Sequence, residues 1–143
     1  MPADHSNAPP LPPLPPSPGR PPVVLVIDDD ASMRAALRRF LEREGYRVVE
    51  SVSGRDALTL LREGIGVQLV VTDLKMKDGS GGWLLAQLGY EFPALLLRTL
   101  VVSGDAGSAG AAHVVARWRC PLLPKPFGAG ELIDALQELE RVG

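Results

Sequence analysis

The stretch Val67-Gln68-Leu69-Val70-Val71-Thr72-Asp73 decides the fold of this chain. It is a short apolar run, rich in β-branched residues, that ends abruptly on a carboxylate. Runs of this kind are typical of strands buried on both faces, which occur in parallel sheets. Ligands of such sheets bind in the crevice beyond the carboxyl ends of the strands. The pattern therefore predicts that Asp73 stands at the reactive edge of a parallel sheet.

Three further apolar runs end on groups that handle phosphate or metal. They are Val23-Val24-Leu25-Val26-Ile27 before Asp28-Asp29-Asp30, Leu100-Val101-Val102 before Ser103-Gly104, and Pro121-Leu122-Leu123-Pro124 before Lys125-Pro126-Phe127. Any one of these ends is most simply a solvated strand terminus. Four ends that each carry a group of this kind favour a shared site instead.

Composition narrows the class of protein. At 143 residues, the chain has room for one domain with a real core. A formal net charge of -2 gives no electrostatic basis for binding nucleic acid, and no room remains for a DNA-reading module after Lys125. Cys120 is the only cysteine, which excludes an internal disulfide and fits a reducing cytoplasm. No apolar run approaches the roughly 20 residues that cross a bilayer, and no secretory signal begins the chain.

The first 22 residues differ in kind from the rest, because ten of them are proline. Such a segment favours polyproline II or disorder. We interpret residues 1–22 as a stiff tether or unstructured extension, with a ligand for a PxxP-binding groove as the alternative. Residues 23–143 then form the folded domain.

Helical and extended patterns alternate five times along this domain. Helices are expected at 31–44 after the cap Asp30, from the cap Ser53 to about residue 63, around Trp83 to Leu88, at 108–118 and at 130–141. Strands are expected at 47–52, 99–102 and 121–123, besides the two that precede Asp28 and Asp73. The helix at 108–118 is expected to be partly unformed because it is rich in glycine and alanine. The alternation predicts an α/β fold with a doubly wound, five-stranded parallel sheet.

In the flavodoxin-like form of this architecture, the first and third strands are neighbours, which puts Asp28 and Asp29 beside Asp73. Carboxylates this close repel one another and need a cation. Oxygen ligands without His or Cys favour Mg²⁺. Lys125 adds a fixed positive charge and Ser103 a hydroxyl. Together these groups predict a carboxylate nucleophile, Asp73, equipped to receive a phosphoryl group.

The chain from residue 23 to 141 resembles the response-regulator receiver domain of two-component signalling. The resemblance rests on Val24-Leu25-Val26-Ile27-Asp28-Asp29-Asp30, Asp73-Leu74-Lys75-Met76, Val102-Ser103-Gly104 and Lys125-Pro126-Phe127, in that order. It implies that Asp73 accepts phosphate, that Asp28, Asp29, Asp73 and the Lys75 carbonyl hold Mg²⁺, and that Ser103 and Lys125 contact the phosphoryl group. It also implies a cis Lys125–Pro126 bond.

The resemblance further implies the partners. The phosphoryl donor would be a sensor histidine kinase or a histidine phosphotransfer domain, and the output a changed surface for a downstream protein, formed by the last two strands and helices. Neither DNA nor a membrane is an expected partner, and the expected location is the cytoplasm. Such a domain is not an enzyme beyond phosphorylating and slowly dephosphorylating itself. The Met1 start favours a stand-alone regulator, whereas the Pro-rich segment would be a linker within a sensor kinase.

Three departures from the family pattern matter. Leu122 replaces the aromatic residue that usually reads out phosphorylation, and Lys77 replaces the proline that commonly follows Met76. Lys75 and Asp105 flank the site, and we predict that they pair across it and slow hydrolysis of the acyl phosphate.

Two other functions remain open. One is a receiver-fold scaffold that never cycles. The other is a phosphohydrolase resembling the haloacid-dehalogenase type, with Asp28 as nucleophile, Asp30 as acid/base, and Ser103 and Lys125 holding phosphate. Such enzymes need a further acidic residue at a strand end after the lysine. Here only Glu131 and Asp134 follow Lys125, and both are expected in a helix. A Ser-His-Asp hydrolase has little support from His5 and His113.

Overall fold

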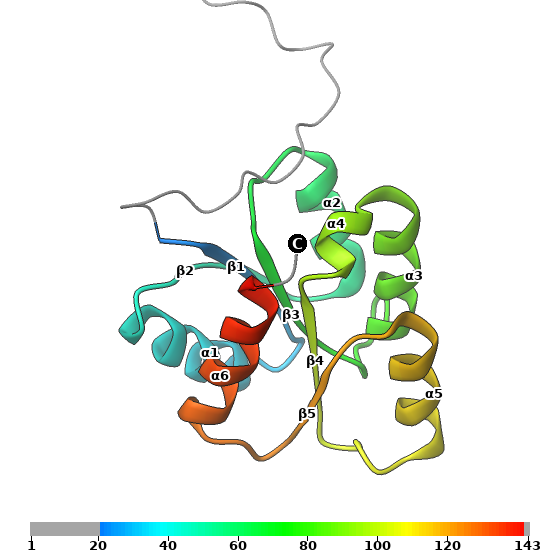
Figure 1. Cartoon of the computed structure of the whole chain (residues 1–143). Helices are drawn as coiled ribbons and strands as arrows, with labels where there is room; N and C mark the ends of the chain where they lie inside the picture. Colours follow the sequence, from blue (N-terminus) through cyan, green and yellow to red (C-terminus); the bar gives the residue numbers. More distant parts are fainter. Residues whose placement is uncertain (1–20, 142–143) are drawn as a thin grey trace, which may run out of the picture.

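A single parallel sheet forms the centre of the molecule in the computed structural model, which describes residues 21–141 (Figure 1). Its strands lie in the order β2-β1-β3-β4-β5. They span Val23–Ile27 (β1), Arg47–Ser51 (β2), Leu69–Asp73 (β3), Thr99–Ser103 (β4) and Leu122–Pro124 (β5). The predicted α/β, doubly wound, five-stranded parallel sheet is confirmed. The prediction for the Pro-rich residues 1–22 falls almost wholly outside the described residues.

Helices cover both faces of the sheet. The helices α1 (Ala31–Arg43) and α6 (Ala129–Glu140) pack on one face, and α2 (Gly54–Arg62), α3 (Gly81–Glu91), α4 (Pro93–Leu96) and α5 (Ala109–Trp118) pack on the other. Successive strand residues serve opposite faces, since Val24 and Val26 pack toward α1 and α6 while Leu25 and Ile27 pack toward α2 and α3. This double coverage explains why the strands are continuous apolar runs.

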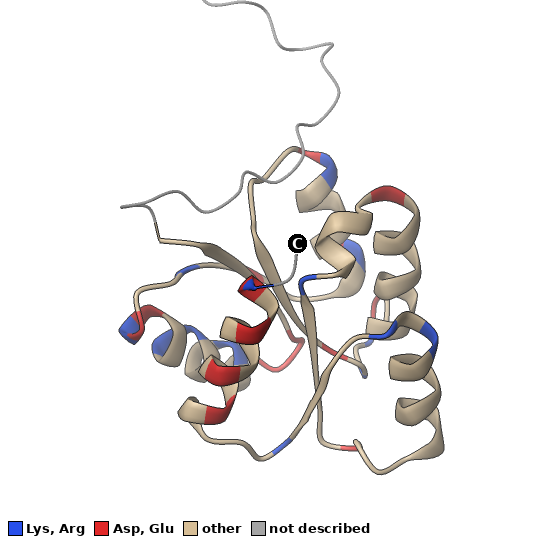
Figure 2. Ribbon diagram, viewed as in Figure 1, with Lys and Arg blue, Asp and Glu red and all other residues tan. Residues whose placement is uncertain are grey.

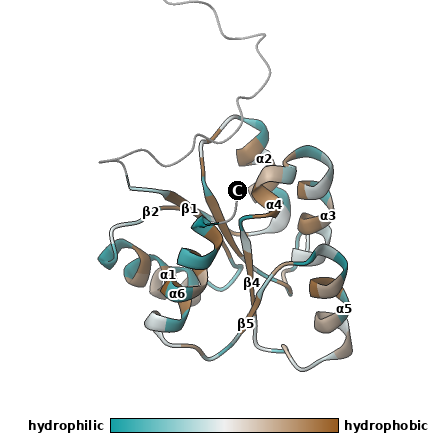
Figure 3. Ribbon diagram, viewed as in Figure 1, coloured by the Kyte–Doolittle hydropathy of each residue, from teal (hydrophilic) through white to brown (hydrophobic). Residues whose placement is uncertain are grey.

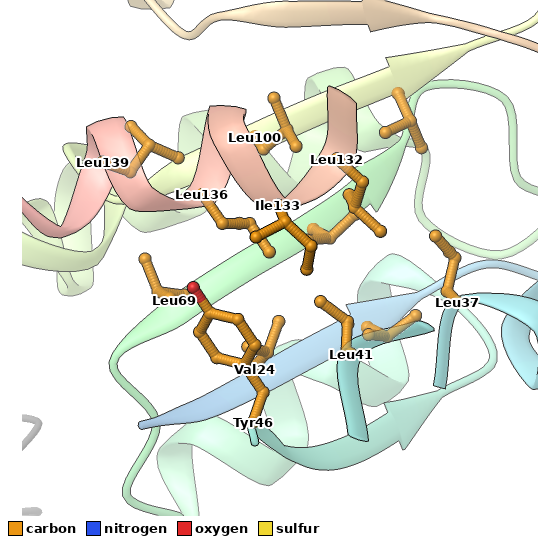
Figure 4. Packing of buried hydrophobic residues seen from close by; sticks show 13 residues of the cluster. Val24, Leu37, Leu41, Tyr46, Leu69, Leu100, Leu132, Ile133, Leu136 and Leu139 are labelled. Carbon is orange, nitrogen blue, oxygen red and sulfur yellow. The ribbon is translucent and has the colours of Figure 1, made fainter. Parts of the chain in front are cut away.

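The core beneath α1 and α6 is built from aliphatic side chains (Figure 4). Leu132 and Leu136 of α6 are fully buried against Leu69 of β3 and Leu100 of β4. Tyr46 closes one end of this layer, and its hydroxyl donates to Glu140 at 2.8 Å. In Figure 3 the central strands are mostly brown, which marks hydrophobic residues, and the surrounding helices carry teal, hydrophilic positions. The rigid sheet therefore provides a fixed platform for the strand ends.

Local signals placed the helix ends as predicted. The side chain of Asp30 accepts from the N–H groups of Ser32 and Met33 at the start of α1, and Ser53 accepts from Asp56 at the start of α2. Gly45, just beyond α1, has a φ of 94°, a conformation that glycine adopts without strain. These ends fix where the loops that carry the acidic residues begin.

Three details differ from the sequence-based expectations. The one-turn helix α4, begun by Pro93, was not predicted, because its residues read as part of one apolar run that continues into β4. The helix α5 is complete over ten residues, since Ser108 caps it and Val114, Val115 and Trp118 pack beside the sheet. The last strand is Leu122–Pro124, one residue later than expected.

The two edges of the sheet are protected differently. The edge strand β2 carries the charged residues Arg47 and Glu50. The opposite edge, β5, is flanked or ended by Pro121, Pro124 and Pro126, and the N–H of Lys125 donates to the carbonyl of Ser103 at 2.8 Å.

Among residues 21–141, no helix is long and apolar enough to span a bilayer.

Candidate functional site

The candidate site lies at the carboxyl edge of the sheet, where the register brings the strand ends together. Ile27 is paired with Thr72, Asp73 with Val102, and Ser103 with Pro124. The acidic residues that follow β1 and end β3 therefore face the lysine that follows β5. Figure 2 shows acidic residues in red at the lower ends of these strands and a basic position in the connection from β5 to α6.

Asp73 is the end of the central strand β3 and is only 8% exposed. Its Oδ2 accepts from the ammonium of Lys125 at 2.7 Å. Its Oδ1 accepts from the backbone N–H of Lys75 at 3.3 Å. Both carboxylate oxygens are thus oriented, one by a cation and one by the following loop.

Lys125 joins Asp73 to Asp28. Its Nζ lies 3.2 Å from Oδ2 of Asp28 as well as 2.7 Å from Asp73. The backbone of Lys125 is held to β4 through Ser103, and the Lys125–Pro126 peptide is cis, as expected. Burial by itself would lower the pKa of Lys125, but the hydrogen bond and charge of Asp73, with those of Asp28, raise it. The lysine therefore stays cationic between the two carboxylates.

Asp28 is the most deeply placed acid of the site, with 1% of its surface exposed. Burial raises the pKa of this carboxyl above its ordinary value, and the nearby charge of Asp73 acts in the same direction. The N–H of Asp30, which donates at 2.9 Å, and the ammonium of Lys125 act against this rise. The site thus holds a carboxylate whose charge is only partly compensated.

Asp29 lies apart from this pair. It is exposed, and its Oδ2 accepts from the backbone N–H of Lys77 at 3.3 Å. Within residues 21–141, no three Asp, Glu, His or Cys side chains are grouped closely enough to hold a metal. Of the predicted acidic trio, the structure therefore joins Asp28 and Asp73 through Lys125 and leaves Asp29 at the rim.

The donor chemistry of the site nevertheless fits Mg²⁺. The two buried carboxylates share a single ammonium, and a third carboxylate follows one residue after Asp28. All the side-chain ligands offered are oxygens, which a hard cation prefers. Asp28, Asp73, the neighbouring Asp29 and the carbonyl of Lys75 are the groups that would hold such an ion.

The Ser103 side chain is buried at the end of β4, with 1% exposed. Its Oγ accepts from the backbone N–H of Asp105 at 3.1 Å. Asp105 in turn forms the predicted pair with Lys75, with Nζ and Oδ2 2.7 Å apart. The Lys75 side chain is 75% exposed, so this pair lies at the rim of the site.

The loop after β3 is held by close backbone contacts. The N–H of Gly54, at the start of α2, donates to the carbonyl of Gly79 at 2.9 Å. The N–H of Gly81 donates to the carbonyl of Leu74 at 2.9 Å, and a Cβ on Gly81 would overlap the carbonyl oxygen of Asp73. Only glycine lets the start of α3 approach Asp73 this closely. These contacts fix the segment that carries Lys75.

A pocket of 460 Å³ adjoins this loop. Its lining consists of Asp29, Leu74, Lys75, Met76, Lys77 and Ser80. Its lining combines the apolar residues Leu74 and Met76 with the charged residues Asp29, Lys75 and Lys77.

Sequence reasoning missed one residue of the site, Arg34. Its side chain is only 15% exposed, whereas that of Arg38 on the same helix is 43% exposed. Its Nη1 donates to the backbone carbonyl of Asp28 at 2.7 Å, and its Nε donates to Oε1 of Glu50 at 3.2 Å. An arginine among other arginines on a helix carries no sequence signal for this contact.

The residues of the alternative functions are placed elsewhere. The carboxylate of Asp30 caps α1, and that of Glu131 accepts from the N–H of Gly128 at the start of α6. Asp134 is exposed on α6, and His113 is exposed on α5. His5 lies outside the described residues. Among the described residues, the Asp30 carboxylate is thus used as a helix cap and His113 lies on the surface, away from Ser103 and Asp73 in the chain.

Comparison with known proteins identifies the family of this chain. Residues 24–137 match the response regulator receiver domain. The chain belongs to this family. Over 117 residues it is 34% identical to the sensor kinase CckA of Brucella abortus, covering 81% of this chain and 12% of that protein. Over 124 residues it is 36% identical to the response regulator MprA of Mycolicibacterium vanbaalenii, covering 82% of this chain and 50% of that one.

The receiver fold is shared with solved structures. A response regulator receiver protein from Pseudomonas putida superimposes with a TM-score of 0.75 at 31% identity, covering 84% of this chain and 98% of that one. The receiver chain spans half or less of the two curated relatives named above. One of these is a sensor kinase and the other a response regulator, so receivers similar to this one occur in both settings.

Proposed function

We propose that this receiver domain accepts a phosphoryl group on Asp73 from a phosphohistidine and transmits the change to a downstream protein. The donor would be a sensor histidine kinase or a histidine phosphotransfer domain. The observation that carries the proposal is the Lys125 ammonium, which contacts both Asp73 and Asp28 at the carboxyl edge of the sheet. The pocket beside Lys75 and Asp29 supports access of a donor from that side.

The transfer is a displacement at phosphorus. One carboxylate oxygen of Asp73 forms a bond to phosphorus while the phosphorus–nitrogen bond of the donor breaks, and the electron pair of that bond stays on the imidazole nitrogen. When bound, Mg²⁺ would neutralise charge on the transferred group. Lys125 supplies a second positive charge that is already in contact with the acceptor.

Ser103 has a hydroxyl that can join the phosphoryl group once it is attached. Its oxygen accepts from Asp105, which leaves the hydroxyl proton for a new acceptor. The register pairs Ser103 with Pro124 and Val101 with Leu122, so Leu122 lies two residues before the partner of Ser103 on the neighbouring strand, and a turn of the Ser103 side chain would change the space beside it. Leu122 is half-buried beside Val114, Val115 and Trp118, so its repacking would alter the surface of β5 and α5.

We infer that the domain acts in the cytoplasm, where histidine kinases and Mg²⁺ are available. A second candidate is a scaffold with the receiver fold that never cycles. Leu122 favours this alternative, because it has no large ring to bury or expose. Both candidates use the same output face and differ in whether Asp73 reacts.

The test is the intact mass of the chain after incubation with acetyl phosphate and Mg²⁺. We expect a phosphate adduct that disappears with EDTA and in Asp73→Asn. No adduct, under conditions that label an established receiver, would favour the scaffold. Steady hydrolysis that survives Asp73→Asn but not Asp28→Asn would instead indicate a phosphohydrolase.

A further inference from the structure

The residues Arg34, Glu50 and Arg38 form a network beside the acidic loop. Glu50 of β2 accepts from Nε of Arg34 at 3.2 Å through one oxygen and from Nη1 of Arg38 at 2.7 Å through the other. The hydrogen bonds from Arg38 and from Arg34 hold the pKa of Glu50 below its ordinary value, so Glu50 stays ionised. Glu50 thus aligns two guanidinium groups that lie one helical turn apart on α1.

Only one of these arginines reaches the site. Arg34 donates through Nη1 to the backbone carbonyl of Asp28 at 2.7 Å, whereas the second contact of Arg38 is with Glu42 at 3.1 Å. Arg34 is also the more buried, with 15% of its side chain exposed against 43% for Arg38. The planar guanidinium lets Arg34 hold a carboxylate and a carbonyl at once.

The carbonyl of Asp28 fixes the direction of the next residue. Because a peptide unit is planar, holding this oxygen orients the whole link from Asp28 to Asp29. The other end of Asp28 is tied to β2, since its N–H donates to the carbonyl of Ser51 at 3.2 Å. The contact of Arg34 therefore decides how the loop leaves β1 and in which direction the Asp29 carboxylate starts.

We propose that Arg34 is a positioning residue for the acidic pair Asp28 and Asp29, aligned by Glu50 and acting through the Asp28 carbonyl. The inference rests on the proposed Mg²⁺-dependent function. Groups that orient metal ligands without touching the ion commonly change metal affinity by roughly 10-fold or more when removed. Arg34 holds such a place with respect to Asp29.

The test compares Mg²⁺ binding by titration calorimetry in the parent, Arg34→Met and Arg38→Met. Both substitutions remove one positive charge and one bond to Glu50, but only the first removes the bond to Asp28. We expect roughly 10-fold weaker binding in Arg34→Met and less than about twofold change in Arg38→Met. Loss of a nearby positive charge alone would strengthen Mg²⁺ binding, so the expected weakening has the opposite sign to that effect.

A metal-free readout accompanies the titration. Amide hydrogen exchange at Asp29 and Asp30 should become faster in Arg34→Met than in Arg38→Met. If Arg34→Met fails to fold, Glu50→Gln provides the second variant, because it keeps both arginines and removes their alignment; it should weaken Mg²⁺ binding by a smaller factor.

Equal Mg²⁺ affinity in Arg34→Met and the parent, with unchanged exchange at Asp29, would overturn the positioning role and leave the proposed function intact. Absence of Mg²⁺ binding in the parent would overturn the proposed function, and this inference with it.

Discussion

The ammonium of Lys125 lies 2.7 Å from Oδ2 of Asp73, so the proposed acceptor already has a positive charge beside it before any phosphoryl group arrives. The same nitrogen lies 3.2 Å from Asp28, which is buried. Lys125 is therefore both a countercharge for the fold and a participant in the proposed transfer. The two roles can be separated by measuring stability and phosphorylation in the same variants.

Lys125→Met should reduce both the stability of the fold and the phosphorylation of Asp73. Removing one partner of a buried ion pair typically costs about 3 kcal/mol or more, and we expect a loss of about that size in the free energy of unfolding at pH 7.5, measured in urea. Without the ammonium, the pKa of Asp28 should rise further, so the folded state holds a proton that the unfolded state releases. The loss should therefore be smaller near pH 5 than at pH 7.5. Lys75→Met, at an exposed lysine beside the same site, is the control for stability, and its free energy of unfolding should be close to that of the parent.

Asp28→Asn should stabilise the protein at neutral pH while abolishing Mg²⁺ binding. The pKa of Asp28 is raised in the folded state, so its contribution to stability is favourable at low pH and is lost as the pH rises through the folded pKa. A neutral side chain avoids that loss. Urea unfolding from pH 4 to pH 8 should show a gain that grows with pH. A gain of equal size at every pH would contradict the assigned cause.

Lys75→Ala should shorten the lifetime of phosphorylated Asp73. The substitution removes the ion pair with Asp105 and opens the rim to water, while it leaves the backbone N–H and carbonyl of residue 75 in place. The measurement is the decay of the phosphate adduct by intact mass after removal of acetyl phosphate. Asp105→Asn should act in the same direction. A Lys75→Ala half-life equal to that of the parent would remove the shielding role.

Gly81→Ala should destabilise the protein by about 1–3 kcal/mol, the typical cost of forcing extra atoms into a filled space. A Cβ there would overlap the Asp73 carbonyl oxygen and lie 2.7 Å from Cα of Leu74. Gly82→Ala is the matched control, since its Cβ would meet Cγ2 of Val114 at an ordinary 3.6 Å. Gly82→Ala should instead stabilise the protein by up to about 1 kcal/mol, because alanine has a better helix propensity than glycine. Thermal unfolding of the two variants side by side checks both signs.

Cys120 should react slowly with thiol reagents. Burial raises the pKa of its thiol to about 11, and the residue is 6% exposed. At pH 9 only about 1% of such a thiol is ionised, whereas an ordinary cysteine is mostly thiolate. Reaction with a disulfide reagent at pH 9 should therefore be slow in the native protein and fast in urea. Rapid native labelling would show that the side chain is more accessible than its packing beside Leu85 and Val101 indicates.

Much of the fold could be predicted because its signals are local. The apolar run before Asp73 and the caps Asp30 and Ser53 act within a few residues of where they stand in the chain. The adjacency of Asp28 and Asp73 also followed, because the order of strands in such sheets is restricted. The helix α4 was not predicted, because a single helical turn is too short to show a helical repeat of apolar residues.

Within the site, the missed details depend on three-dimensional placement. Nothing in the sequence separates Arg34 from its neighbours Arg38 and Arg39, since the difference is a carbonyl that comes within reach only after β1 and α1 have packed. The same holds for Asp29, whose side chain turns to the N–H of Lys77 rather than to Asp73. Sequence patterns identify which residues share an edge, but not which way each side chain turns there.

The prolines around β5 limit how this domain can associate with others. Of residues 121–126, three have no N–H, and the N–H of Lys125 is already bonded to Ser103. Only Leu122 and Leu123 remain, and in an extended strand they point in opposite directions, so one N–H at most faces outward. An added strand on this side would therefore find at most one backbone N–H donor between residues 121 and 126. A partner that binds beside β5 has to recognise side chains, and the same prolines protect the edge from strand-mediated aggregation.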